Sequence, residues 1–166
     1  MANSDSLLML AGFVFAHATW SVSDLTEGES LVPLVISENG GHRQLMRFEA
    51  ETQAQAIAEG KAELAAHGNE FDAWAFAREG QFKEDGAYVD VLTVEAKSKD
   101  MKEPIAFIQR FRPYATGEFK LIGQPMVVIG GEVISENEAA PFIVQLRRGI
   151  LSHDKAAELW PSWTTP

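Results

Sequence analysis

The sequence predicts an α+β fold in which two helices pack on an antiparallel sheet of about five to six strands. Two turn signals, Asn39-Gly40-Gly41 and Glu84-Asp85-Gly86, each separate two segments of strand-like composition, which is typical of hairpins. Two further segments, residues 5–22 and 52–68, carry apolar residues at helical spacing. The predicted order is α-β-β-α-β-β-β, followed by an irregular strand and short C-terminal helices.

The first apolar segment, Leu7–Ala16, predicts a helix that runs to about Val22. Asn3, Ser4 and Asp5 offer N-caps for it. Apolar residues on most sides of a helix indicate that it is buried between partners. Phe13-Val14-Phe15 also favours a strand, and the sequence leaves that alternative open.

The same segment has the length of a secretory signal, and Ala16-His17-Ala18 mimics a cleavage site. However, no Lys or Arg precedes it and Asp5 lies in its flank, so the basic region of a signal is missing. A run of ten apolar residues is also too short to span a bilayer. We therefore expect a buried helix, no membrane association and a cytoplasmic protein.

Four segments are expected to form the two hairpins. Leu31–Ser37 and Gln44–Glu49 flank the first turn, and Pro33 favours an edge position for the first of them. Phe71–Phe82 and Tyr88–Lys97 flank the second turn. Each pair is expected to be antiparallel, because the connections are too short for a crossover.

The second predicted helix opens at Thr52-x-x-Gln55, which has the spacing of a capping box, and ends near Gly68. Ile105–Arg112 predicts a fifth strand, and residues 119–129 predict one more strand that is interrupted at Gly123-Gln124-Pro125. In topology alone, this order resembles the small sheet-and-helix modules of the roadblock and profilin-like type, and no residue motif assigns a function through that resemblance.

The C-terminal part predicts short helices. Pro141 suits the first position of one helix, while Ser152 is expected to cap a last turn that Pro161 stops. We expect a single domain over residues 1–166, in which residues 117–166 either join the main sheet or wrap back on it as an appendage.

Composition excludes several kinds of chemistry. The chain has no cysteine, which rules out disulfides, thiolate metal sites and a cysteine nucleophile. Its formal net charge of −10 disfavours nucleic acid and anionic membranes. No two histidines have the spacing of metal ligands on one helical face, and no serine elbow or nucleotide-binding loop is present. We expect no catalytic residue, no metal and no cofactor.

Five residues are hypothetical ligand contacts. His17 lies in an apolar segment near Trp20, although a lone histidine there is more often a hydrogen-bonded core residue. Arg47, Arg110 and Arg112 could hold a carboxylate or a phosphate. The alternative for the last two is an ion pair with a cross-strand acid such as Glu95.

Two functional hypotheses remain open. The first is a noncatalytic interaction or assembly module, expected to be a homodimer that uses a sheet edge, the first helix, or Trp160 and Trp163 as anchors. The second is a small-molecule-binding protein or enzyme, whose pocket would lie between the sheet and the first helix, near His17. Self-association or a protein partner is expected in the first case.

Overall fold

The structure is a computed structural model that describes residues 4–164, so that Asn3, one of the predicted N-caps, lies outside the described residues. Within this range the chain forms four α-helices. They are α1 (Ser4–Val22), α2 (Gln53–His67), α3 (Glu136–Leu151) and α4 (Asp154–Thr164). Two short 3-10 turns, η1 (Gly68–Glu70) and η2 (Tyr114–Thr116), follow α2 and the fifth strand.

The described strands form one antiparallel sheet of seven strands, in the order β2-β1-β3-β4-β5-β6-β7. Their bounds are β1 (Leu34–Asn39), β2 (His42–Arg47), β3 (Ala73–Glu84), β4 (Ala87–Ser98), β5 (Ile105–Arg112), β6 (Lys120–Ile129) and β7 (Glu132–Val133). The α+β class, the antiparallel sheet and the short C-terminal helices are confirmed. The sheet has one strand more than expected, because the Gly130-Gly131 turn leads into the two-residue strand β7.

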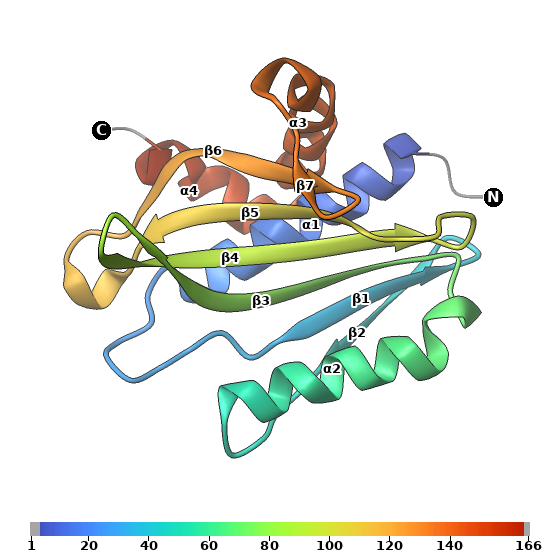
Figure 1. Cartoon of the computed structure of the whole chain (residues 1–166), viewed down its shortest axis with the longest axis horizontal. Coiled ribbons are helices and arrows are strands. Elements are labelled where there is room, and N and C mark those ends of the chain that lie inside the picture. Colours follow the sequence, from blue (N-terminus) through green and yellow to red (C-terminus); the bar gives the residue numbers. More distant parts are fainter. Residues whose placement is uncertain (1–3, 165–166) are drawn as a thin grey trace.

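One face of the sheet carries the main core. Alternate residues of β3, β4 and β5 point to this face, and they are small where α1 crosses: Ala75, Ala77 and Ala96 are almost completely buried. Phe107 and Val94 fill the space beside them. Figure 1 shows α1 on this side of the sheet, together with α3 and α4. The first helix is therefore sandwiched between a sheet and two helices, as its apolar surface predicts.

The opposite face is covered only in part. Helix α2 packs on β1 and β3 through a small second core that contains Val35, Trp74 and Phe76. Gly60 lets α2 approach closely, since a Cβ there would lie 2.8 Å from the Phe76 ring. The capping box of Thr52 and Gln55 is present, and it fixes the start of the helix.

Helices α1 and α3 cross at two glycines. A Cβ atom on Gly12 would lie 2.1 Å from the Leu146 carbonyl oxygen, and one on Gly149 would lie 2.2 Å from the Met9 carbonyl oxygen. No larger residue fits at either position without moving a helix backbone. Among the described helices, α1 is the one with the length and apolarity of a membrane span, but 61% of that stretch is buried inside the protein.

The first hairpin differs from its prediction at the sheet edge. Pro33 precedes β1, and its carbonyl accepts a hydrogen bond from the Phe48 amide, so the proline removes no bond from the strand ladder. Strand β1 lies between β2 and β3, and β2 occupies the edge instead. The edge prediction for Leu31–Ser37 is therefore wrong.

The C-terminal helices differ more. Helix α3 begins at Glu136, because the Ser135 hydroxyl accepts from the Glu138 amide, and Pro141 lies inside the helix rather than at its first position. Ser152 ends α3 instead of capping the next helix. Helix α4 continues past Pro161, since the burial of Trp163 holds its last turn.

Candidate functional site

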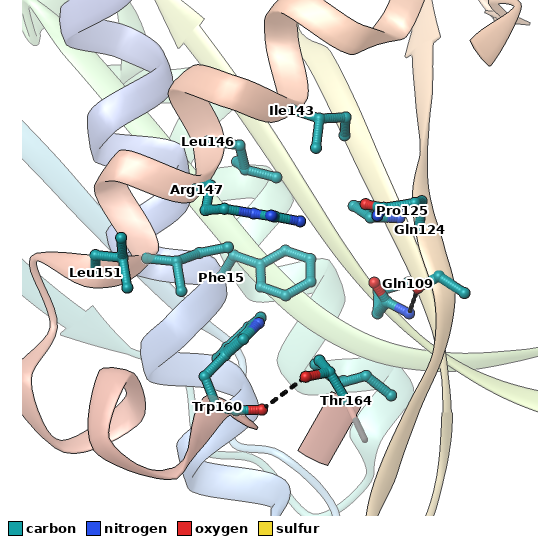
Figure 2. Close-up of a pocket in the computed structure, with 13 residues that line it drawn as sticks. Phe15, Gln109, Gln124, Pro125, Ile143, Leu146, Arg147, Leu151, Trp160 and Thr164 are labelled. Carbon is teal, nitrogen blue, oxygen red and sulfur yellow. Dashed lines mark hydrogen bonds between the residues drawn. The ribbon is translucent and has the colours of Figure 1, made fainter. Parts of the chain in front are cut away.

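A pocket of about 380 Å³ lies between α1, α3, α4 and the irregular part of β6. Its lining mixes apolar side chains with polar groups, and its floor is formed by Phe15 and Gln109 (Figure 2). The remaining lining residues are Leu121, Gly123, Gln124, Pro125, Ile143, Leu146, Arg147, Ile150, Leu151, Trp160 and Thr164. Five elements, α1, β5, β6, α3 and α4, thus contribute to one cavity, as is usual for small-molecule sites.

Gln109 is the polar residue at the floor. It lies on the core-facing side of β5 between Phe107 and Phe111, and is only 2% exposed. Its Nε2 donates to the carbonyl oxygens of Arg110, Ile122 and Gly123, at 2.8–3.1 Å. These bonds satisfy the β6 bulge opposite the residue, where the pairing register shifts. The amide oxygen, turned toward the other lining residues in Figure 2, is left as an acceptor for a ligand.

Arg147 brings a positive charge to the pocket. Its side chain extends from α3 across the cavity toward Gln124 and Pro125 in Figure 2. On the α4 side, Trp160 packs against Phe15, with ring centroids 5.7 Å apart, and Thr164 donates to the Trp160 carbonyl. The pocket therefore combines apolar side chains, one amide acceptor and one cation.

A second cluster joins two histidines from opposite ends of the chain. His17 of α1 and His153, which precedes α4, are linked by a hydrogen bond of 3.1 Å between Nδ1 and Nε2. The Ala156 amide donates to Nδ1 of His153, so this ring acts as the N-cap of α4. Because Nδ1 accepts, the neutral ring carries its proton on Nε2 and donates it to His17.

The surroundings favour the neutral form of both rings. Burial lowers the pKa of His17, and His153 and Arg47 lower it further by electrostatic repulsion. Burial likewise lowers the pKa of His153, against smaller opposite effects of a backbone hydrogen bond and Asp154. The pair can therefore act as a hydrogen bond that ties α1 to the first turn of α4.

Aromatic and cationic side chains surround this pair. Phe13 and Trp20 lie 5.1 and 5.7 Å from the His153 ring, measured between centroids. Arg43 of the edge strand β2 stacks over Phe13 at 5.0 Å, and Arg47 is on the same face of that strand. The structure thus brings three of the predicted ligand contacts, His17, Trp20 and Arg47, into one neighbourhood.

The two other predicted contacts lie elsewhere. Arg110 is on the far face of the sheet, where it donates to Glu84 at 2.8 Å, while Glu95 pairs with Arg78 instead. Arg112 donates to the Glu118 carbonyl oxygen. Neither side chain faces His17, since β5 turns them to the side of the sheet opposite α1.

The two predicted interface tryptophans pack back on the protein. Trp163 is 6% exposed and stands edge-on to Phe119, with centroids 5.6 Å apart. Trp160 is half-buried, contacts Trp163 and lines the pocket of Figure 2. The C-terminal aromatics thus contribute to the core and to the cavity wall.

The sequence predicted a pocket beside His17. The pocket is lined by Phe15 instead, because residues two positions apart on a helix point in nearly opposite directions. Gln109, Arg147 and His153 were missed. Of these three, Gln109 could have been identified from the sequence. It is an amide between two phenylalanines on an apolar strand face, where an unpaired polar group would be costly. The other two lie in ordinary polar sequence.

Comparisons with known proteins identify no family for this chain. Within residues 4–164, no group of three His, Asp or Glu side chains could hold a metal ion. No protein-family model, no curated protein and no solved structure matched the chain. The pocket and the histidine pair are therefore the features of this chain from which a function can be inferred.

Proposed function

We propose that this protein is a noncatalytic binding protein that holds a small, largely apolar molecule in the pocket between α1, α3, α4 and β6. The observation that carries the proposal is the Gln109 amide. Its nitrogen is fully used by three carbonyls of the chain, and this leaves its oxygen toward the cavity. A free acceptor at the floor of a pocket that also has apolar walls gives the orientation and selectivity that binding sites require.

The size and composition of the pocket support binding. Its volume of about 380 Å³ falls within the range of small-molecule pockets, which runs from about 300 to 1,000 Å³. Leu151 is 58% exposed, and Ile143 and Trp160 are partly buried, so the lining still presents apolar surface to water. A ligand that fills this space gains free energy by removing that surface from water.

The lining residues favour binding over catalysis. None of them is a histidine, a cysteine or a carboxylate, and these groups carry most acid–base and nucleophilic chemistry. The Thr164 hydroxyl is bonded to the helix backbone, and no base lies among the lining residues to activate it. The proposal of a noncatalytic protein depends on this set of groups.

A neutral apolar dye, N-phenyl-1-naphthylamine, tests the proposal. We expect its fluorescence to rise on binding, and we expect Ile143→Trp, which fills the cavity from α3, to remove most of that rise. Leu159→Trp is the matched control, because Leu159 is an exposed residue of α4 outside the pocket lining. Equal dye binding by both variants and the wild-type protein would exclude this cavity as the site.

Self-association is a second proposed function, and the exposed edge of β2 favours it. Helix α1 and Trp163 are buried, which leaves the sheet edge as the remaining predicted interface. Leu45 of this strand is 43% exposed beside unpaired backbone groups. Light scattering at micromolar concentration is expected to give a dimer that Leu45→Lys dissociates, and a monomeric wild-type protein would contradict this proposal.

A further inference from the structure

We infer that the ligand of this pocket is an amphipathic carboxylate, whose anionic group binds Arg147 and whose apolar chain lies along the groove between α3 and β6. This inference rests on the proposed function, because it names the class of molecule that the same pocket holds. It goes further in assigning a charge, an orientation and a second stretch of binding surface.

Arg147 lies where two hollows meet. Beyond the pocket of Figure 2, a second hollow of about 520 Å³ runs along the outer side of α3. The two hollows share five lining residues: Gln124, Pro125, Ile143, Arg147 and Leu151. The two hollows therefore adjoin along these residues, with the Arg147 side chain on their shared boundary, and together they are called the groove.

Arg147 is one of four arginines of this chain for which no acidic partner is found among residues 4–164, and it differs from the other three in its place between the two hollows. Arg43, Arg78 and Arg110 each pair with a glutamate. No ion pair or hydrogen bond is found for the Arg147 guanidinium among residues 4–164, although the chain has 24 acidic residues. An arginine that has no acidic partner in the protein can bind the carboxylate of a ligand in this groove, by donating two parallel hydrogen bonds to it.

The polar group at the floor of the pocket determines the orientation of the bound ligand. The Gln109 amide oxygen presents partial negative charge there, which repels a carboxylate. The anion is therefore placed at Arg147, and the inner pocket receives an uncharged part of the molecule. Phe15, Leu146 and Trp160 surround that part.

The outer hollow suits an extended apolar chain. Its walls are made by small and branched apolar residues of α3, namely Ala139, Ala140, Ile143, Val144 and Leu151. Its charged lining residues besides Arg147 are Glu136 and Arg148, at the two ends of the helix. An aliphatic chain fits between them without meeting a charge.

A matched set of ten-carbon probes tests the inference. Decanoate, decanol and protonated decylamine differ in the charge of the head group and share one chain. We expect decanoate to displace the bound naphthylamine dye about tenfold more tightly than decanol, and decylamine to be the weakest. Arg147→Met is expected to lower the affinity for decanoate to that for decanol, and to leave the affinity for decanol unchanged.

Two control variants test which arginine binds the carboxylate of decanoate. Arg112→Met removes a cation on the other side of the sheet, and Arg148→Met removes the neighbour of Arg147 on α3. Both are expected to keep the preference for decanoate. Loss of the preference in Arg148→Met but not in Arg147→Met would overturn the assignment to Arg147.

The outcomes separate this inference from the proposed function. If decanol binds as tightly as decanoate while the dye still binds, the carboxylate assignment fails and the binding function stands. If neither the dye nor any of the three probes binds, both fail. Tight binding of decylamine would reverse the sign of the head group and overturn the inference alone.

Discussion

At the scale of single residues, the His17–His153 hydrogen bond gives the protein a defined response to acid. Nδ1 of His153 accepts from Ala156 while Nε2 donates to His17, so a proton added to either ring breaks one of these bonds. Burial is the main cause of the lowered pKa of both rings. The unfolded state therefore binds protons more readily than the folded state does.

We predict that the free energy of unfolding declines as pH falls below the ordinary histidine value of 6.5 through the lower pKa values of the folded state. The stabilisation is complete above pH 6.5, where both rings are neutral in either state. Urea denaturation between pH 7.5 and 5 measures it, as the difference between the wild-type protein and the His17→Gln/His153→Asn double variant.

The wild-type protein must be compared with the double variant, because two other groups change the stability with pH in the opposite direction. Burial raises the pKa of Glu79, and the Glu70 hydrogen bond raises that of the exposed His67, so each favours the folded state at lower pH. Neither is altered in the double variant. An unchanged pH dependence in that variant would show that the histidine pair does not cause the decline.

Gln109 gives a second prediction at this scale. Replacing it with Leu leaves three backbone carbonyl oxygens, one of β5 and two of the β6 bulge, without this donor, so we expect a loss of about 1–3 kcal/mol in unfolding free energy. Gln81→Leu is the control, because that exposed amide bonds only Asp90 and the change should stay within about 0.5 kcal/mol. Chemical denaturation of both variants measures the contrast.

At the scale of elements, the crossing of α1 and α3 is the most restrictive contact. Alanine in place of glycine usually stabilises a helix by about 1 kcal/mol. Here we predict the reverse: Gly12→Ala or Gly149→Ala should destabilise the protein by about 1–3 kcal/mol or more, since each Cβ would overlap a backbone carbonyl of the other helix. The shift in thermal midpoint measures it.

Gly80→Ala is the control for these substitutions. Gly80 lies in β3 with an ordinary backbone conformation, and a Cβ there would meet nothing within 4 Å. Its thermal midpoint should stay near the wild-type value or rise. If Gly12→Ala behaved in the same way, the two helices could not be as close as the structure places them.

Element boundaries show where local rules were sufficient. The Thr52 capping box, the Gly86 turn and the strand Ile105–Arg112 match the sequence predictions, because each depends on residues adjacent in the chain. Pro141 and Pro161 do not. Both prolines lie inside helices, where tertiary packing compensates for the lost hydrogen bond.

At the scale of the whole molecule, the C-terminal third completes the core. Strand β6 pairs with β5 along its length, and Leu146 and Ile150 of α3 are buried in the main core with α1. A chain that ends at residue 134 would expose the glycine face of α1 and the floor of the pocket. We predict that it loses cooperative unfolding and binds a hydrophobic dye nonspecifically, as measured by denaturation and fluorescence.

The chain of residues 1–166, purified in parallel, is the reference for that experiment. A truncated chain with a sharp, reversible transition would show that residues 135–164 are an appendage on a domain that folds alone. This outcome would also move the proposed pocket from the core to a dispensable surface, since α3 and α4 supply most of its walls.

The sequence by itself determined the α+β class, the antiparallel hairpins and the absence of cysteine chemistry, whereas the structure settled that residues 5–22 form a helix and not a strand. The features that the sequence determined depend on composition and on spacings of a few residues, which local physics controls. Tertiary structure alone decided that His17 meets His153, 136 positions away, and that Gln109 and Arg147 share one groove. Such meetings depend on how a sheet and its helices pack, and no local spacing encodes that arrangement.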